Sequence, residues 1–460
     1  MFRRIWSSLM ARNVKKIDKK QHFKPKVLDL FSGAGGISWG FHSAGFKIIG
    51  GLDYFGASIE SFEKNMPEAV GMVRDLRKPG FDDVRDVIGT EDIDVIVGGP
   101  SCQGFSTSGG LSRTSGRDES DPRNRLFINY LDMVDEFRPS WIVFENVPGL
   151  LLYNQGRVAI DIVRAFKEIG YSVAPMILLA ADFGVPQLRR RLFFVGNRTG
   201  ADNCFPAATH GNPELWKNYS LPFAHLSRIG HGANREVAPH VSFADACSDL
   251  PPIEEGEELN GAQYLCDPTT PYQALMRTHS QTVEQHAAAD LPSLDRLAAT
   301  VLLEGQNWRN MPANSLPARF SRIRPYDATT LLKRLSSGLP SYTITTKFNE
   351  ATTGAFIHPT QARTISLREA ARLQSFPDHF LFSGTASQIR QQIGNAVPPI
   401  LAQAIAEAIY PSVVRDVFKE NVESTRDSVV VENSLTESDI LKLKAPRRVR
   451  EQEEITYDQV

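Results

Sequence analysis

Short apolar runs alternate with helix-like stretches through the first 200 residues of the chain. The strand-like runs are residues 27–31, 48–53, 93–98, 141–146 and 192–196. Between them, stretches such as 59–65 and 126–137 have the spacing of amphipathic helices. Short buried strands that alternate with helices are typical of a parallel sheet with helices on both faces. The pattern therefore predicts an α/β fold with a mostly parallel sheet.

The regular pattern is interrupted in the second half of the chain. From residue 199 to 359, Pro, Gly, Asn and His become frequent and the apolar spacing is weak, which predicts a separate, irregular domain. Helical spacing returns at 368–376, where Ser366 and Glu369 form a capping-box pattern, and again at 399–409.

The chain ends and the overall charge narrow the class of protein. Residues 3–26 are basic, residues 413–460 carry mixed charge with few aromatic side chains, and we expect a flexible leader and a disordered tail. The chain has 51 Lys+Arg against 53 Asp+Glu, a formal net charge of −2. This balance argues against a protein that coats nucleic acid, but it leaves room for a local basic face. Residues 305–349 carry seven Lys or Arg against one Asp, which favours a phosphate-contacting surface over a merely solvated one.

The cysteines are dispersed, with no C-x-x-C pair. Cys102, Cys204, Cys247 and Cys266 therefore predict neither a structural zinc site nor a disulfide framework, and they fit a reducing cytosol. No run of about 18 apolar residues occurs, so no membrane span is expected.

A glycine-rich turn follows the first predicted strand. Gly33, Gly35 and Gly36 would let the backbone turn tightly and approach a ligand closely. Asp53 ends the next strand, 20 residues after Gly33, where a carboxylate can accept hydrogen bonds from ribose hydroxyls. Asp75, in a turn-like stretch, could accept from an exocyclic amine. The spacing G-x-G-G departs from the full dinucleotide fingerprint, which disfavours a nicotinamide-dependent dehydrogenase.

Two reactive groups are predicted at one rim of the sheet. Cys102 follows the run 93–98 in the stretch Gly98-Gly-Pro-Ser-Cys-Gln-Gly-Phe-Ser, and a thiolate there would be an effective nucleophile. The sequence beyond it is polar and rich in Ser and Gly, and we expect it to be mobile enough to close over a substrate. Glu145 ends the run 141–146, so its carboxyl group can bond to, or protonate, a ring nitrogen at the same rim.

A cluster of arginines opens the following strand. Alternation sends Arg189 and Arg191 to one face and Arg190 to the other. Two guanidinium groups on one face suit a phosphate or a carbonyl oxygen.

Taken together, these residues resemble the DNA (cytosine-5) methyltransferase family of the prokaryotic restriction-modification type. The matching stretches are Asp29-Leu-Phe-Ser-Gly-Ala-Gly-Gly, Gly99-Pro-Ser-Cys-Gln-Gly-Phe-Ser, Glu145-Asn-Val, Gln187-x-Arg-x-Arg, Arg368-Glu-Ala-Ala-Arg-Leu-Gln-Ser-Phe-Pro and Gly394-Asn-Ala-Val-Pro-Pro. They occur in the family's usual order over residues 27–409. The resemblance implies a Rossmann-like, S-adenosylmethionine-dependent methyltransferase domain and a smaller, irregular target-recognition domain.

The same resemblance divides the chain into five parts. These are a basic leader at 1–25, a catalytic and cofactor-binding domain at 26–205, a target-recognition domain at 206–360, a C-terminal segment at 361–410 that returns to the catalytic domain, and a charged tail at 411–460.

The resemblance also implies a chemical role for each catalytic residue. Cys102 would attack C6 of a cytosine flipped out of the duplex, while Glu145 holds the base at N3 and its amino group. Arg191, helped by Arg189, would contact the base O2 and support the active loop. The activated ring would take the methyl group of S-adenosyl-L-methionine at C5, after which loss of the C5 proton releases Cys102.

Cofactor and DNA contacts are implied in the same way. The expected cofactor residues are Phe31, Gly33, Gly35, Gly36, Asp53, Tyr54, Asp75, Leu76, Pro100 and Asn395. The expected DNA contacts are Gln103 and Ser106 in the loop after the cysteine, Arg322 and Arg324 at phosphates, and Thr345 and Asn349 at base edges. No metal site is expected.

The implied setting is a monomer in a prokaryotic cytoplasm, acting on double-stranded DNA without contact to a membrane. A cognate restriction endonuclease that acts on the same site is the usual companion of this family, and no direct contact with it is implied. Two alternatives stay open, an RNA cytosine-5 methyltransferase of the same fold and a non-catalytic DNA-binding protein. The size of the recognition region argues against the first, and the intact pair Cys102 and Glu145 argues against the second.

Overall fold

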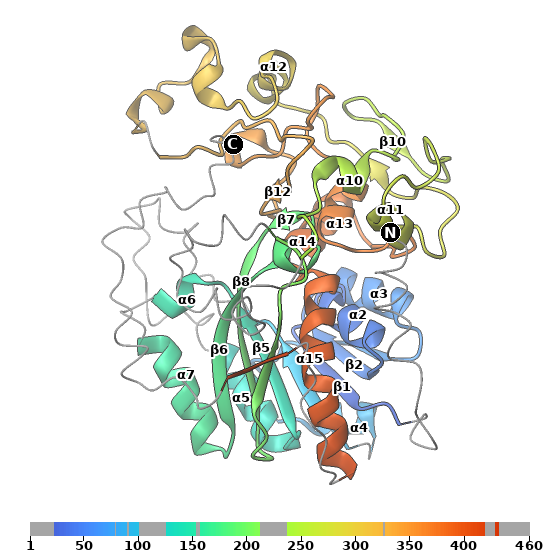
Figure 1. Cartoon of the computed structure of the whole chain (residues 1–460), viewed down its shortest axis with the longest axis vertical. Helices are drawn as coiled ribbons and strands as arrows, with labels where there is room; N and C mark the ends of the chain where they lie inside the picture. The colour runs from blue at the N-terminus through green and yellow to red at the C-terminus, as the bar shows by residue number, and fades with distance from the viewer. Residues whose placement is uncertain are drawn as a thin grey trace.

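The protein consists of an α/β domain beneath a smaller, irregular domain (Figure 1). The computed structural model describes residues 23–78, 80–89, 92–100, 126–152, 157–211, 237–324, 327–418 and 428–431. Three residues of the predicted site, Cys102, Gln103 and Ser106, lie outside these ranges, as do most of the predicted basic leader and much of the tail.

A seven-stranded sheet forms the centre of the larger domain, in the order β3-β2-β1-β4-β5-β8-β6. Its strands are β1 (Lys26–Leu30), β2 (Lys47–Asp53), β3 (Val70–Val73), β4 (Val95–Gly98), β5 (Trp141–Asn146), β6 (Ser172–Leu179) and β8 (Arg190–Asn197). The first five strands in that order, β3 to β5, are parallel to one another, and β8 runs antiparallel to both β5 and β6. The chain order reverses at β1, so a ligand crevice is expected outside the carboxyl ends of β1 and β4. The predicted α/β class is confirmed.

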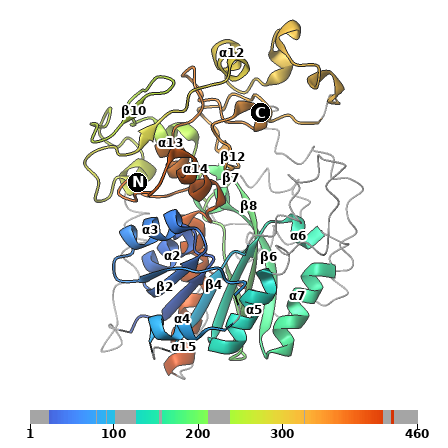
Figure 2. The same ribbon diagram turned by 180° about the vertical axis from the view of Figure 1, so that it is seen from behind.

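Helices cover both faces of this sheet because its central strands are apolar on both sides. One face is covered by α2 (Gly36–Ser43), α3 (Gly56–Asn65) and α15 (Pro399–Phe418), and the other by α4 (Asp82–Ile88), α5 (Leu126–Phe137), α6 (Gly149–Leu152) and α7 (Arg157–Glu168). Figures 1 and 2 show the two faces in turn. Each face holds its own buried apolar cluster, which fixes the sheet between two helical layers.

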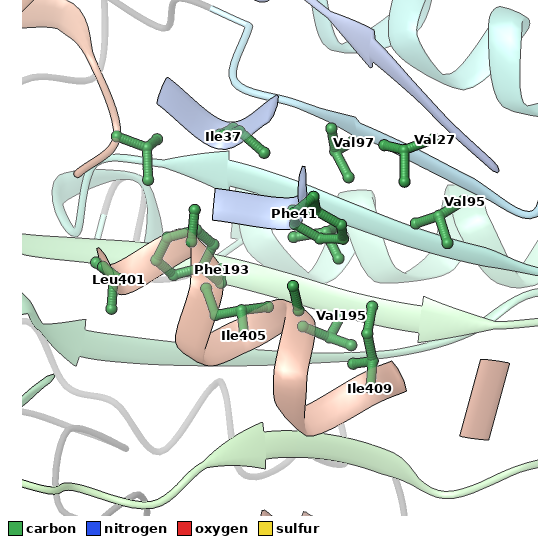
Figure 3. Packing of buried hydrophobic residues seen from close by; sticks show 14 of the residues in the cluster. Val27, Ile37, Phe41, Val95, Val97, Phe193, Val195, Leu401, Ile405 and Ile409 are labelled. Carbon is green, nitrogen blue, oxygen red and sulfur yellow. The ribbon is translucent and has the colours of Figure 1, made fainter. Parts of the chain in front are cut away.

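The C-terminal helix α15 completes the first of these clusters. Its side chains Leu401, Ile405 and Ile409 are fully buried and lie with Phe41 of α2 over the strands (Figure 3). Within the described residues, only Ala386–Arg415 is long and apolar enough to span a membrane by length and composition, and 61% of its apolar window is buried inside the protein. The apolar surface of α15 is therefore accounted for by core packing.

The smaller domain is built from short elements around a buried ionic network. Its helices are α10 (Phe243–Cys247), α11 (Pro271–Met276), α12 (Ser293–Val301), α13 (Leu367–Leu373) and α14 (Ala386–Asn395), and its short strands include β10 (Glu258–Leu259), β11 (His286–Ala287) and β12 (Ser341–Tyr342). The guanidinium of Arg372 is fully buried between the carboxylates of Asp249 and Asp378. Ser366 and Glu369 form the predicted capping box at the start of α13.

One predicted boundary, the start of the tail at residue 411, differs from the structure. Within the 361–410 segment, α13 and α14 pack in an apolar cluster that also includes Ala34 of the larger domain, and α15 covers the sheet of that domain. The tail expected at 411–460 begins too early, because α15 continues through Pro411 to Phe418 and buries Val413. Farther on, the β-branched run of β13 (Ser428–Val431) pairs antiparallel with β9 (Asn203–Pro206). The charged composition of this part hid both apolar segments.

Candidate active site

A left-handed turn links β1 to α2 at the switch point of the sheet. Phe31, Gly33 and Gly35 have φ angles of 61°, 55° and 98°. A non-glycine residue such as Phe31 in this region is uncommon and costs free energy, which is typical of functional turns. Asp29, fully buried in β1, accepts a hydrogen bond from Ser38 Oγ of α2 at 2.6 Å. Burial raises the pKa of Asp29 to about 7, against the effect of Ser38.

The carboxylate of Asp53 supports this turn from the end of β2. Its Oδ2 accepts from the Gly33 backbone N–H and its Oδ1 from that of Phe55, both at 2.9 Å. Burial raises the pKa of Asp53, and these backbone donors oppose the rise. Each carboxylate oxygen can accept more than one hydrogen bond, so a ribose hydroxyl can still be bound there. Beside it, Tyr54 exposes 66% of its surface and is free to stack on a flat ring.

The third predicted cofactor group lies after β3. Asp75 accepts from Arg77 Nε at 2.9 Å and from Nη2 at 2.7 Å, and this bonding lowers its pKa to about 2. An ionised carboxylate has more than one acceptor site on each oxygen, so Asp75 can still accept a hydrogen bond from an amine. Leu76 next to it is buried in one of the two apolar clusters that cover the sheet.

The C-terminal segment reaches the same turn from the other side. A Cβ atom at Gly36 would lie 2.4 Å from the backbone oxygen of Val397, so only glycine allows this approach. Asn395, two residues before Val397, ends α14 and is exposed. The carboxylate of Asp53 and the backbone of Val397 thus both lie against the glycine turn, where a Cβ at Gly33 would meet no atom within 4 Å.

The predicted acid, Glu145, lies at the next carboxyl end and is paired with arginine. Arg191 Nε of β8 lies 2.8 Å from Glu145 Oε1, and both side chains are largely buried. Burial raises the pKa of Glu145, while the charges of Arg191 and then Arg189 act in the opposite direction. A buried carboxyl group with a raised pKa is suited to donate a proton to a ring nitrogen.

Gly99 and Pro100, which follow β4 and lead to Cys102, lie directly against this pair. A Cβ at Gly99 would lie 2.7 Å from Glu145 Oε2. Asn146 Nδ2 donates to the backbone oxygen of Pro100 at 3.3 Å, which ties the two carboxyl ends together. Pro100 is the last described residue before Cys102, which follows two positions later.

Arg189 is placed differently from the expectation that it helps to hold a base. It is 1% exposed, and its Nη1 and Nη2 donate to the backbone oxygens of Ile344 at 2.8 Å and Gly394 at 2.9 Å. Burial lowers its pKa, and the charge of Arg191 adds to this effect. Its hydrogen bonds are made to other chain segments and not toward Glu145.

The basic stretch at 305–349 is not one surface, which corrects the simple charge count. Arg334 is buried and donates to the backbone oxygens of His358, Pro359 and Gln361, and Lys333 is buried beneath Tyr342. The basic side chains of this stretch that remain exposed are Arg319, Arg322, Arg324 and Lys347. The number of charges can be read from the sequence, but it does not show which basic side chains are buried in hydrogen bonds within the domain and which are exposed to a ligand.

A family profile for C-5 cytosine-specific DNA methylases matches residues 25–411. The chain belongs to this family. It is 32% identical over 459 residues to the type II methyltransferase M.DdeI of Desulfomicrobium norvegicum, covering 94% of this chain and 99% of that protein. It is 31% identical to the type II methyltransferase M.AgeI of Thalassovita gelatinovora, covering 84% of this chain and 99% of that protein.

A solved structure shows the same fold. A prophage-encoded E. coli chain, described as a candidate DNA modification methyltransferase, superposes with a TM-score of 0.61 at 23% identity, covering 84% of this chain and 99% of that one. The family predicted from the motifs is confirmed, and the chain is a DNA (cytosine-5)-methyltransferase.

Some contacts of this methyltransferase could not be found from its motifs. Asn65 of α3 exchanges two hydrogen bonds with the backbone of Leu381, at 2.8 and 3.0 Å. Ser61 of the same helix donates to Gln392 Oε1 at 2.6 Å. These contacts join the helix that follows Tyr54 to the smaller domain across more than 300 residues of sequence. Neither periodicity nor motif spacing carries a signal for such a distant pair.

Proposed function

We propose that the chain methylates C5 of a cytosine flipped out of double-stranded DNA, through a covalent bond between Cys102 and C6. The observation that supports this most is the buried pair of Glu145 and Arg191 against the Gly99–Pro100 turn. Cytosine C5 is a poor nucleophile until addition at C6 breaks the aromatic ring. An acid and a cation at the strand ends, with Cys102 two positions after Pro100 in the sequence, match that need.

Three residues of the chain, Cys102, Glu145 and Arg191, have separate tasks in this reaction. The Cys102 thiolate forms a bond to C6, and Glu145 donates a proton to N3, which leaves an enamine with electron density at C5. Arg191 donates to the base O2 and holds Glu145 in place. After methylation at C5, the C5 proton passes to solvent water, the electron pair of the C5–H bond re-forms the 5,6 double bond, the C6–S bond breaks to release the Cys102 thiolate, and the N3 proton returns to Glu145.

S-adenosyl-L-methionine would supply the methyl group from the glycine turn. The residues present fit this group, because Asp53 can accept from ribose hydroxyls, exposed Tyr54 can stack on adenine and Asp75 can accept from its amine. The open space at Gly33 leaves room for a ligand against the backbone.

The DNA is proposed to lie between the two domains. A base inside a stacked duplex cannot be reached by Cys102, so the target must be extruded at a cost of a few kcal/mol. Exposed Arg322 and Arg324 would offset that cost at phosphates, and Gln103 and Ser106 would contact DNA from the loop after the cysteine. Both relatives are type II methyltransferases, which supports a restriction endonuclease that acts on the same site.

The test combines methyl transfer with covalent trapping. Purified protein is incubated with S-adenosylmethionine carrying a labelled methyl group and with duplex DNA or transfer RNA. We expect 5-methylcytosine in duplex DNA alone, none with Cys102→Ala, and a denaturant-resistant complex with DNA that carries 5-fluorocytosine. Activity in the Cys102→Ala variant, or no trapped complex with an active enzyme, would contradict the mechanism. Transfer only to RNA would contradict the substrate.

A further inference from the structure

The guanidinium of Arg189 joins three segments that are far apart in sequence. It lies between β7 (Gln187–Leu188) and β8, and donates to Ile344 and Gly394 through different nitrogens. Ile344 directly precedes Thr345, and Gly394 directly precedes Asn395. Thr345 is proposed to read a base, and Asn395 is proposed to contact the cofactor. Each of them thus directly follows a residue whose backbone oxygen is bonded to Arg189.

The contact to the recognition segment is reinforced along its length. β12 pairs in parallel with β7, with Ser341 opposite Gln187 and Tyr342 opposite Leu188. The Ile344 N–H donates to Gln187 Oε1 at 2.9 Å, and Thr343 Oγ1 donates to the Leu188 oxygen at 3.0 Å. The backbone that carries Thr345 is therefore fixed in register to the strand that leads into Arg191.

The contact to the cofactor side leaves no space for independent movement. A Cβ at Gly394 would lie 2.4 Å from Thr346 N and 2.5 Å from Thr345 C. The two backbones touch, and the bond from Arg189 closes them on each other. A displacement of Thr345 must then be transmitted to Gly394 and Asn395 at the end of α14.

We propose that Arg189 is a positioning residue that couples recognition of the DNA sequence to the chemical step. This inference rests on the proposed function and assigns Arg189 a role other than contact with the base. A duplex with a wrong base displaces the Thr345 segment, strains the Ile344 bond and shifts the start of β8. Arg191, two residues after Arg189, then holds Glu145 less well, so a mismatch lowers kcat and not only binding.

Arginine is the residue that this role requires. Its planar fork presents separate donors in fixed directions, whereas a lysine ammonium is a point charge that cannot hold two carbonyls in the same geometry. In the described part of the chain, Arg189 bonds to backbone oxygens and its Nε has no partner. A buried charge held in this way is costly, which argues for a role beyond packing.

The test compares Arg189→Lys with a matched control at the other end of β8. Arg198 also bridges two backbone oxygens, those of Arg138 and Pro139, at 3.1 and 3.0 Å. The single-turnover rate of methyl transfer, and the steady-state kcat and KM, are measured on the sequence that the enzyme recognises and on duplexes with one changed flanking base. We expect Arg189→Lys to narrow the ratio of cognate to mismatched kcat by about tenfold, within the usual range of coupling energies, and Arg198→Lys to leave it unchanged.

Two further measurements protect the test against a folding defect. Gly394→Ala keeps Arg189 but pushes on Thr345, so it should narrow the same ratio. Hydrogen exchange needs no methyl transfer: S-adenosylhomocysteine should slow exchange at residues 341–346 in the wild type and in Arg198→Lys. In Arg189→Lys this slowing should be lost.

The outcomes separate this inference from the proposed function. A wild type that methylates no DNA contradicts the function, and the exchange measurement alone then decides the coupling. An active wild type with an unchanged ratio in Arg189→Lys and Gly394→Ala overturns the coupling. An equal loss of kcat on every sequence in Arg189→Lys overturns it as well, because Arg189 would then support the chemical step without responding to the sequence.

Discussion

Arg191 of β8 and Glu145 of β5 meet across an antiparallel strand pair, with Nε 2.8 Å from Oε1. Because the two strands are hydrogen-bonded neighbours, the backbone of the sheet sets this geometry. The site therefore offers a carboxyl group whose pKa is raised by burial and whose position is fixed by a cation.

Replacing Glu145 by Gln should lower turnover far more than cofactor affinity. A general acid contributes about 10²–10⁴-fold in rate, whereas Asp53 and Tyr54 remain intact. Since burial raises the pKa of Glu145, the wild-type rate should fall as pH rises through that pKa, and this limb should vanish in the variant. Single-turnover rates across pH and calorimetric binding of S-adenosylhomocysteine measure both. Unchanged turnover would assign Glu145 to structure, and exposed Glu136→Gln is the control.

Tyr54→Ala should weaken S-adenosylhomocysteine binding while the free protein melts at an unchanged temperature. Stacking of a base on an aromatic ring is worth about 1–3 kcal/mol, which is about 5–150-fold in Kd. The exposed ring contributes little to the core. Tyr54→Phe keeps the stacking surface and should bind normally. Equal binding by the Ala variant would show that adenine lies elsewhere.

Neutralising Arg322 and Arg324 together should weaken binding to all DNA sequences alike. Two lost phosphate contacts would flatten the salt slope by roughly one to two units. Arg85→Ala, an exposed arginine paired with Glu136 on the catalytic domain, should leave the slope unchanged. Affinity is measured against salt concentration. A change in sequence preference with an intact slope would reverse the assigned roles.

Changes at Thr345 or Asn349 should alter which sequence is methylated. Thr345 is exposed while the residue before it is buried and bonded to Arg189, so its hydroxyl is presented on a rigid segment. A lost base contact would cost about 1–3 kcal/mol of discrimination. Bisulfite sequencing of DNA from cells that express each variant gives the spectrum of sites. An unchanged spectrum for both variants would place base reading on other residues.

Lowering the pH should destabilise the protein through His210. Burial, and then the charge of His240, lower its pKa from 6.5 to about 4. The folded state therefore favours the neutral ring, so this stability is present above pH 6.5 and is lost as pH falls from there to about 4. His210→Gln should flatten that decline by about 1–2 kcal/mol, because the ring is only partly buried. Denaturant unfolding at several pH values tests this, and parallel curves for both proteins would contradict it.

The sequence predicted the larger domain well because its signals are local. Runs of β-branched residues mark β1, β2, β4 and β5, and the capping box at Ser366 marks α13. Motif residues then fall at strand ends, where topology brings Asp53, Tyr54 and Glu145 to one rim.

The sequence could not predict what depends on long-range packing. Arg334 and Arg322 both lie in the same basic stretch of sequence, and nothing in their neighbouring residues tells them apart. Arg334 is nevertheless buried and bonded within the smaller domain, whereas Arg322 is exposed. The alternation that placed Arg189 beside Arg191 is a property of one strand, whereas its partners Ile344 and Gly394 come from segments 155 and 205 residues away. Two short parts of the predicted tail, residues 411–418 of α15 and β13, are regular because their apolar side chains find distant partners, and the charged sequence around them gave no local signal for this.

The position of α15 has a consequence for how the protein is made. Its side chains Leu401, Ile405 and Ile409 cover one face of a sheet whose strands all come from the first 200 residues. During synthesis, the part of that face that α15 covers stays exposed while some 200 further residues leave the ribosome, a delay of about 10–40 s at roughly 5–20 residues per second. Although α2 and α3 already cover the rest of the face, this part is an exposed apolar surface for all of that time. Nascent chains of this enzyme should therefore depend on chaperones until the last helix emerges.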